Sequence, residues 1–321
     1  MKTNLLNLIK PELDELEKSL TRSLSSDIDL ATKISSYIVD SGGKRIRPTI
    51  TILIAKTLGY EGDELINLAT AIELLHTATL IHDDVVDQSE IRRGKTSIQK
   101  KWDNAHGVLV GDFVYSKAFQ LMASLEDKEI IHTLANSTNK ISEGEVLQLN
   151  FKGTNKIKEK DYFEIIERKT AELFKASAHT GAILAKASKY LIQVSCEFAY
   201  SLGISFQLKD DLLDYTGQQQ KTGKSIGKDF EEGKLTLPLI MAFELTNKEE
   251  FHTIRTAFAA RDTTRLKEVI KIIYQSGAID KVEKTRNKFS KKCLNLLEKL
   301  PKTPYINSLQ GIVLGLDKRT K

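Results

Sequence analysis

The segment Leu80-Ile81-His82-Asp83-Asp84-Val85-Val86-Asp87 carries an Asp-Asp-x-x-Asp cluster inside an otherwise apolar run, and residues 207–214 (Gln-Leu-Lys-Asp-Asp-Leu-Leu-Asp) repeat the arrangement. Residues four apart share one face of a helix, so Asp83 and Asp87 project together, as do Asp210 and Asp214. Carboxylates that close repel each other unless a cation neutralises them. Hard divalent ions with oxygen ligands, Mg²⁺ above all, suit such pairs. One cluster is compatible with a solvated helix face, but two of equal spacing favour metal sites.

Length and composition indicate a helical globular protein. The chain has 321 residues, of which 28% are charged and 40% apolar. This length accommodates one large domain or two small ones. Only five prolines occur, and Leu, Ile, Ala, Glu and Lys dominate, which favours long helices. The net charge of +5 is mild and spread out. It does not indicate nucleic acid, but it is compatible with a phosphate-bearing substrate or an anionic membrane surface.

The two cysteines, Cys196 and Cys293, exclude a disulfide framework and make a thiolate metal site improbable. The apolar run at the N-terminus is too short and too soon charged for a signal peptide. No stretch reaches the ~18 apolar residues expected of a membrane span. A cytoplasmic protein is therefore expected.

Apolar residues recur every three or four positions in seven segments, which predicts a helix in each. The segments are 30–39, 64–88, 107–125, 129–150, 161–187, 191–215 and 235–247. Loops are expected at 41–44, 152–160 and 216–234, where Gly, Lys and polar residues gather. No linker or change of composition interrupts the chain, so one domain over residues 1–321 is predicted. Segment 280–300 is amphipathic and basic, and a solvated outer helix is the expectation there rather than a membrane-surface role.

Cationic side chains recur near the acidic clusters. Arg92 and Arg93 follow the first cluster, and guanidinium groups suit phosphate oxygens. Residues 42–48 (Gly-Gly-Lys-Arg-Ile-Arg-Pro) stand at an expected helix start, where backbone N–H groups and the helix dipole add to the positive charge. His76 lies almost two turns before Asp83 on nearly the same face, so a site role is as well supported as a core role. Each cation alone has a structural explanation, but together with two carboxylate pairs they indicate a pocket for diphosphates.

Several motifs resemble those of the trans-isoprenyl diphosphate synthases, also called polyprenyl synthetases, and in particular the bacterial long-chain members such as octaprenyl diphosphate synthase. They occur between about residues 40 and 240 in the order that the family has. Besides the acidic clusters they include Gly-Gly-Lys-Arg-Ile-Arg-Pro, Arg-Arg-Gly (92–94), Gly-Asp-Phe (111–113), Glu-Gly-Glu (143–145), Lys-Thr-Ala (169–171) and Gly-Lys-Asp-x-x-Glu-Gly-Lys (227–234). The resemblance implies an all-α, single-domain bundle of long antiparallel helices around a deep central cavity, and a homodimer.

The same resemblance implies a role for each matching residue. It places Mg²⁺, three ions per active site, on Asp83, Asp87 and Asp210, with Asp84, Asp211 and Asp214 in support. It assigns to the allylic diphosphate the residues Arg92, Lys169, Thr170, Gln207, Lys224 and Lys234. It assigns to isopentenyl diphosphate the residues Lys44, Arg47, His76 and Arg93.

The reaction explains these residue types. Breaking the allylic C–O bond leaves diphosphate and a carbocation, and cations stabilise the charge that develops on the leaving oxygen. The carbocation must meet the double bond of isopentenyl diphosphate and not water, so an apolar, closed cavity is expected. The resemblance implies that diphosphate takes up the final proton. The ring of Phe206 faces either this cation or the core.

The growing chain is expected to run along the helix before Asp83. Thr79 lies about 6 Å below that carboxylate and Leu75 about 12 Å below. Short-chain relatives close the pocket with large aromatics four or five residues before the first Asp, where this chain has Thr79 and Ala78. Phe119 or Met122 is a candidate for a deeper floor. We therefore expect a long product of about seven to ten isoprene units, with octaprenyl diphosphate as the single expectation, made from farnesyl or geranylgeranyl diphosphate for quinone side chains.

Other classes of protein share parts of this pattern. A short-chain synthase is the main alternative. A terpene cyclase would replace the second acidic cluster, and a squalene-type coupling enzyme would lack the set of Lys44, Arg47 and Arg93. A non-catalytic regulatory subunit would be expected to have lost acidic clusters, and this chain keeps both. The expected partners are small diphosphates, a second copy of the chain and, transiently during product release, a membrane, but no nucleic acid.

Overall fold

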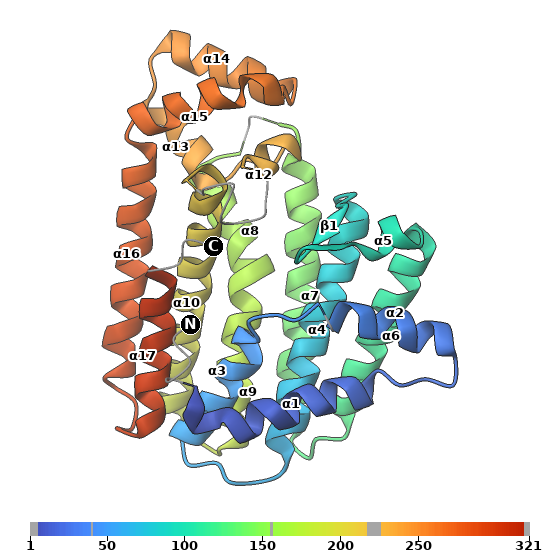
Figure 1. The fold of residues 1–321 in the computed structure, drawn as a ribbon. Coiled ribbons are helices and arrows are strands. Elements are labelled where there is room, and N and C mark those ends of the chain that lie inside the picture. The colour runs from blue at the N-terminus through green and yellow to red at the C-terminus, as the bar shows by residue number, and fades with distance from the viewer. Residues whose placement is uncertain (1–5, 40, 155–156, 217–225, 318–321) are drawn as a thin grey trace. The chain divides into compact units, whose positions relative to one another are not determined.

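The computed structural model describes residues 6–39, 41–154, 157–216 and 226–317, and these are almost entirely helical (Figure 1). The only strands among them are β1 (Ile91–Arg92) and β2 (Lys95–Thr96), which pair antiparallel. The helices and helical turns are η2 (Asn7–Ile9), α1 (Lys10–Ser23), α2 (Asp29–Val39), α3 (Ile46–Thr57), α4 (Glu64–Val86), α5 (Ile98–Lys101), α6 (Asn104–Ala123), α7 (Lys128–Phe151), α8 (Glu159–Ile166), η3 (Glu167–Ala171), α9 (Glu172–Leu184), α10 (Lys189–Thr216), α12 (Lys228–Glu231), α13 (Leu237–Leu245), α14 (Lys248–Ala259), η4 (Thr263–Arg265), α15 (Leu266–Gln275), α16 (Ala278–Leu297) and α17 (Pro304–Asp317).

The chain divides into two compact units. Unit 1 comprises Met1–Thr138, Leu173–Cys196 and Leu297–Leu309, and unit 2 comprises Asn139–Glu172, Glu197–Leu296 and Gln310–Lys321. The first acidic cluster belongs to unit 1 and the second to unit 2. The expectation of a single domain over residues 1–321 stays a prediction.

Helix α4 is the core helix of unit 1. It is apolar on all sides, and a helix of that kind is buried on all sides; α6, α3 and α1 pack against it. Two glycines let α6 approach closely. A Cβ at Gly107 would lie 2.5 Å from Val85 Cγ2, and one at Gly111 would collide with the His82 ring. This packing fixes the direction of α4 and thereby of the carboxylates at its C-terminal end.

The sequence-based statement that no stretch reaches the length of a membrane span needs correction at α4. By length and composition Glu64–Val86 passes as a span, with a mean hydropathy of 1.2 in its most apolar window. However, 67% of that window is buried inside the protein. Burial of this extent is typical of a core helix, so α4 is weak support for membrane insertion.

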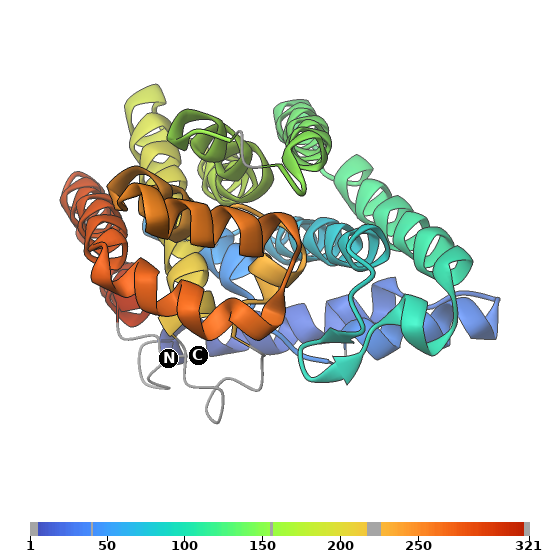
Figure 2. The same cartoon turned by 90° about the horizontal axis from the view of Figure 1, so that it is seen from above.

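Unit 2 has its own apolar core, built from α8, α10, α13, α15 and α16. Helix α16 packs its apolar face inward: Ser290 Oγ lies 3.0 Å from Ser205 Oγ of α10, and Cys293 Sγ donates to the Phe198 carbonyl at 3.6 Å. Helices α14 and α15 run side by side (Figure 2). The core holds the C-terminal parts of α8 and α10 in place, and residues of both helices line a pocket.

The seven predicted helices are all present, with some corrections. The segment 161–187 is not one helix but α8 and α9 joined by a π-helical turn, η3. The loop expected over 216–234 contains the short helix α12, and its residues 217–225 lie outside the described residues. The helix start expected at residues 42–48 is confirmed, because α3 begins at Ile46. The sequence pattern does not predict α1, α14, α15 and α17. Segment 280–300 is helical as expected, as α16.

Candidate functional site

The first acidic cluster stands at the C-terminal end of α4. Asp83 and Asp87 are half-buried, and the helix period puts both on one face. Asp87 ends the helix as its C-cap, and its N–H donates to the Asp83 carbonyl at 2.8 Å. Asp84 is turned by about 100° from Asp83 around the helix and is only 1% exposed. The carboxylate of Asp84 therefore has a structural role, while those of Asp83 and Asp87 remain partly accessible.

Arg92 holds the buried carboxylate of Asp84. Its Nε and Nη2 donate to Asp84 Oδ1 at 2.9 and 2.5 Å. Although burial opposes it, this contact raises the pKa of Arg92, so the guanidinium stays charged. Arg92 thus connects the acidic cluster to the hairpin that follows it.

The β1–β2 hairpin sends Arg92 and Arg93 to different partners. Its two central residues, Arg93 and Gly94, have φ of 51° and 78°, as a two-residue hairpin turn of the I′ type requires. Arg93 Nη1 donates to the carbonyl of Gly42. Gly43 leaves room for this guanidinium, because a Cβ there would lie 2.8 Å from Arg93 Nη1. The hairpin therefore brings Arg93 to the Gly-Gly-Lys-Arg segment, as the assignment of both to one ligand requires.

The start of α3 presents a second group of cations. Arg45 is its N-cap in the left-handed conformation, with φ of 46°, and it is buried in ion pairs with Glu17 at 2.7 Å and Glu73 at 2.8 Å. Lys44 beside it is exposed. Arg47 Nη1 lies 3.0 Å from His76 Nε2, and its guanidinium stacks over the Phe174 ring at 4.6 Å.

His76 is held neutral in this group. Burial lowers its pKa well below the usual value, and the positive charges of Arg47, Arg93, Arg92 and Arg45 lower it further. A neutral ring accepts at Nε2 from the Arg47 guanidinium and carries its proton on Nδ1. His76, Arg47 and Arg93 thus lie in one cationic environment, and Lys44 is exposed. Their assignment to a diphosphate stays a prediction.

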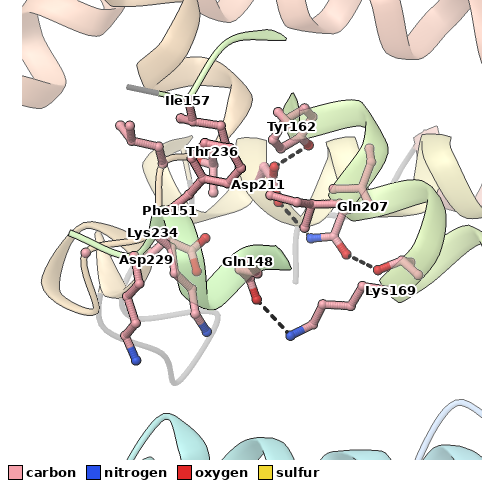
Figure 3. Close-up of a pocket in the computed structure, with 16 residues that line it drawn as sticks. Gln148, Phe151, Ile157, Tyr162, Lys169, Gln207, Asp211, Asp229, Lys234 and Thr236 are labelled. Atoms are coloured by element: carbon pink, nitrogen blue, oxygen red, sulfur yellow. Dashed lines mark hydrogen bonds between the residues drawn. The ribbon is translucent and has the colours of Figure 1, made fainter. Parts of the chain in front are cut away.

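Asp211 of the second acidic cluster lines a pocket of about 130 Å³ in unit 2 (Figure 3). A chain of hydrogen bonds crosses it. Tyr162 Oη donates to Asp211 Oδ2 at 2.5 Å, and Gln207 Nε2 donates to Asp211 Oδ1 at 2.8 Å. Thr170 Oγ1 donates to Gln207 Oε1 at 2.8 Å. Asp211 thereby sets which end of the Gln207 amide points toward Thr170.

Burial explains why Tyr162 is the donor in its hydrogen bond to Asp211. Asp211 is 2% exposed and Tyr162 3%. Burial raises the pKa of Asp211, and the negative charge of Asp229 raises it further. Burial and the Asp211 charge also raise the pKa of Tyr162 well above its usual value, so the phenol stays a donor.

Lys169 lies in the π-helical turn η3. Such turns occur mostly singly within α-helices and are frequent at functional sites. Gly144 of α7 lets this turn approach, because a Cβ there would lie 2.7 Å from Arg168 Cβ. Lys169 Nζ donates to Glu145 Oε2 at 2.6 Å and to Gln148 Oε1 at 3.0 Å, at the wall of the pocket.

The other residues of the second cluster have distinct places. Asp210 is half-buried on α10. Asp214 accepts from the backbone N–H groups of Lys228 and Asp229, both at 3.1 Å, at the start of α12. Lys234 lines the pocket and pairs with Glu232 at 2.8 Å. Lys224 lies outside the described residues.

The chain-length candidates differ in accessibility. Ala78 and Met122 are buried, at 0% and 1% exposed, and so is Leu75. Thr79 is half-buried and shares the face of Asp83, and its Oγ1 donates to the His76 carbonyl at 2.8 Å. Phe119 is 43% exposed and packs edge-on against Tyr115. Thr79 is therefore the candidate that lies on the carboxylate face of α4.

Four residues of this wall or its edge were not assigned from the sequence: Glu145, Gln148, Tyr162 and Asp229. Glu145 and Asp229 lie inside two of the quoted motifs, Glu-Gly-Glu and Gly-Lys-Asp, so the sequence contains a signal that could have identified them as site residues. Tyr162 and Gln148 carry no such signal. Phe206, next to Gln207, is half-buried, which fits either expectation for its ring.

The donor chemistry fits a metal ion bound together with substrate. Among the residues that the structure describes, no group of three His, Cys, Asp or Glu side chains is placed to hold an ion by itself. Asp83 and Asp87 instead offer a pair of accessible carboxylates. Mg²⁺ is usually bound in this way, through one or two carboxylates, several waters and substrate phosphates.

Residues 28–275 match the family model described as Polyprenyl synthetase. The chain is 39% identical over 306 residues to octaprenyl diphosphate synthase of Escherichia coli (strain K12), which covers 95% of each chain. It is 38% identical over 319 residues to an all-trans-nonaprenyl-diphosphate synthase (geranyl-diphosphate specific) of Rhodobacter capsulatus, covering 99% of this chain and 98% of that one. The solved structure of a polyprenyl synthase from Caulobacter crescentus CB15, complexed with calcium and isoprenyl diphosphate, matches with a TM-score of 0.94 and 34% identity, over 99% of this chain and 97% of that one.

The chain therefore belongs to the polyprenyl synthetase family. It has the all-α isoprenoid synthase fold and is a long-chain prenyltransferase, a polyprenyl diphosphate synthase. The resemblance seen in the motifs, the helical fold class and the long-chain reaction are thereby confirmed. The family is one of generally metal-dependent enzymes, which agrees with the paired carboxylates.

Proposed function

We propose that this enzyme condenses farnesyl or geranylgeranyl diphosphate with successive isopentenyl diphosphates to give all-trans octaprenyl diphosphate, for quinone side chains. One observation carries the proposal: Arg92 contacts the first acidic cluster, and Asp211 of the second lines one pocket with Lys169 and Lys234. The chain has these features in common with a family whose members include an octaprenyl and a nonaprenyl diphosphate synthase. In each cycle the allylic C–O bond breaks, a C–C bond forms to isopentenyl diphosphate, and one proton leaves with the released diphosphate.

Asp83, Asp87 and Asp210 are proposed to hold Mg²⁺, three ions per active site with the diphosphate bound. Bound there, the ions supply positive charge to the leaving oxygen. Asp84 and Asp211 act through neighbours, since Asp84 fixes Arg92 and Asp211 fixes Gln207. Asp214 anchors the start of α12, and so places the segment that ends in Lys234.

The two diphosphates are proposed to bind different cations. Lys44, Arg47, His76 and Arg93 bind isopentenyl diphosphate without metal, supported by the gathering of three of them in unit 1. The allylic diphosphate binds to Arg92, Lys169, Thr170, Gln207, Lys224 and Lys234. Lys169 and Lys234 each pair with a glutamate in the described structure, so the substrate has to compete with these carboxylates for the ammonium groups.

The growing chain is proposed to pass Thr79. Its side chain is half-buried on the Asp83 face, while Ala78 and Leu75 are buried in the helix packing. Met122 is a candidate for a deeper floor, because it is buried on α6, the helix that packs against α4. The exposed ring of Phe119 supports a floor less well.

The enzyme is further proposed to be a cytoplasmic homodimer that contacts a membrane transiently when it releases its lipid product. Exposed apolar residues on α6, namely Val108, Leu109 and Phe119, support a protein–protein contact on that helix. Sedimentation velocity of the purified chain would test the dimer, and a monomer at working concentrations would contradict it.

A product assay tests the reaction. The purified chain, supplied with isopentenyl and farnesyl diphosphates and Mg²⁺, should give octaprenyl diphosphate by mass spectrometry. Asp83→Ala, Asp87→Ala and Asp210→Ala should each lower turnover by at least about a hundredfold, corresponding to roughly 2.7 kcal/mol of lost transition-state stabilisation. Asp14→Ala removes an exposed carboxylate on α1 and serves as the matched control. Full turnover in any of the three variants would remove that residue from the metal site.

A further inference from the structure

Helix α16 carries a stripe of lysines on its outer face. The five lysines of the helix, Lys281, Lys284, Lys288, Lys291 and Lys292, are all exposed. Successive residues of an α-helix are turned by 100°, so these five fall within an arc of about 100° and extend over about 16 Å of the helix. Asn295 is the remaining residue on this arc, so no acidic residue interrupts the stripe.

The inner side of α16 explains why the outer side is free for a partner. Val282, Cys293 and Leu296 are buried, at 0%, 0% and 4% exposed, and they anchor the helix in unit 2. Glu283 is turned to internal partners, pairing with Arg286 at 2.8 Å and with Lys209 at 3.7 Å. The apolar face and Glu283 are thus used within the protein, and the exposed Asp280 lies just outside the arc of the five lysines.

The stripe is only weakly neutralised by the protein itself. Lys281 pairs with Glu244 at 3.3 Å. Among the residues that the structure describes, Lys284, Lys288, Lys291 and Lys292 have no carboxylate within ion-pair distance. Four like charges on consecutive turns repel one another, and an anionic partner would relieve that repulsion.

We propose that the lysine stripe of α16 docks the enzyme on an anionic membrane surface. The stripe is straight, contains no arginine and no aromatic residue, and presents point charges on flexible stems. Such groups suit diffuse phospholipid headgroups better than the fixed geometry of bases or of a folded protein. The inference rests on the proposed function in one respect: a polyprenyl diphosphate is itself a lipid, and docking would bring its release next to the bilayer that dissolves it.

The attraction between the lysine stripe and the membrane should be electrostatic. Because the apolar face of α16 is buried in unit 2, the helix cannot insert into the bilayer, and attraction must be electrostatic. Each lysine near an anionic surface strengthens partitioning about fivefold, and the effect is screened within a Debye length. Binding should therefore be reversible, absent on neutral lipid and lost at high salt.

Vesicle sedimentation tests the proposal with the full chain and no substrate. Wild type should bind vesicles of phosphatidylcholine with phosphatidylglycerol and not vesicles of phosphatidylcholine alone. A quadruple variant should bind the anionic vesicles at least about a hundredfold less well. It combines the changes Lys284→Gln, Lys288→Gln, Lys291→Gln and Lys292→Gln. The matched control changes four exposed lysines on four other helices, Lys128, Lys189, Lys248 and Lys271, to Gln. It loses the same net charge and should keep most of the binding.

Equal loss in both variants, or no binding by wild type, would overturn the proposal. Tighter binding to duplex DNA than to anionic vesicles, with the same dependence on the stripe, would point to nucleic acid instead and overturn it as well. Turnover in detergent should be unchanged in the stripe variant, since none of its residues lies in the acidic clusters. An inactive wild type that still binds vesicles would refute the proposed reaction and leave the docking surface intact.

Discussion

At the scale of single residues, the middle aspartates of the two clusters differ from the outer ones. Asp84 and Asp211 are 1% and 2% exposed, and each is held by a neighbouring donor, Arg92 or Tyr162. The helix period separates them from the outer pair, and burial then requires partners for their charge. The three carboxylates of the first cluster look equivalent in the sequence. In the structure Asp83 and Asp87 are partly accessible at the end of α4, and Asp84 is buried and holds Arg92.

Tyr162→Phe should expose the positioning role of the Asp211 anchor. The change removes one donor from a buried carboxylate and loosens the Gln207 amide, which Thr170 contacts. We expect kcat/KM for the allylic diphosphate to fall about tenfold, equivalent to roughly 1.4 kcal/mol, while the KM for isopentenyl diphosphate stays the same. Steady-state kinetics with each substrate varied in turn would measure both.

Tyr200→Phe is the matched control for this prediction. Tyr200 also donates to a carboxylate at 2.5 Å, that of Glu167, but neither residue lines the pocket. Both variants should lose stability by about 1 kcal/mol, the usual size for one hydrogen bond, but only Tyr162→Phe should change the kinetics. The same kinetic change in both would mean that Tyr162 contributes to folding and not to the site.

At the scale of elements, long periodic segments could be predicted from the sequence and local departures could not. The pattern over 64–88 contains both the helix and its acidic end, because apolar period and cluster lie in the same stretch. The π-helical turn of residues 167–171 has no such pattern, since it depends on the close approach of Gly144 to Arg168 and Lys169. The contact of Tyr162 with Asp211 joins α8 to α10 and likewise arises only on packing.

Thr79→Phe tests where the product lies along α4. The ring would occupy the carboxylate face about 6 Å below Asp83, where Thr79 is half-buried. Growth should stop early and shift the main product to about three or four isoprene units, because a packed channel wall yields little to an added ring. Thr79→Val keeps the side-chain size and should keep the long product. Mass spectrometry at matched substrate ratios would compare them, and unchanged long products in Thr79→Phe would show that the chain passes elsewhere.

At the scale of the whole molecule, the acidic clusters belong to different compact units, Asp83 and Asp87 to unit 1 and Asp210 to unit 2. If Asp83, Asp87 and Asp210 bind metal together with diphosphate, as proposed, Mg²⁺ with inorganic diphosphate should raise the thermal midpoint of wild type by several degrees. A ligand at about a hundred times its Kd stabilises the native state by about 2.7 kcal/mol. Asp83→Ala and Asp210→Ala should each lose most of this shift, although they alter different units, and Asp14→Ala should retain it. Mg²⁺ alone should act weakly, because no described group of three side chains holds an ion by itself.

Differential scanning fluorimetry would measure all of these midpoints. A full shift in Asp210→Ala would mean that unit 1 binds the diphosphate without the second cluster, and that Asp210 serves a later step of the reaction.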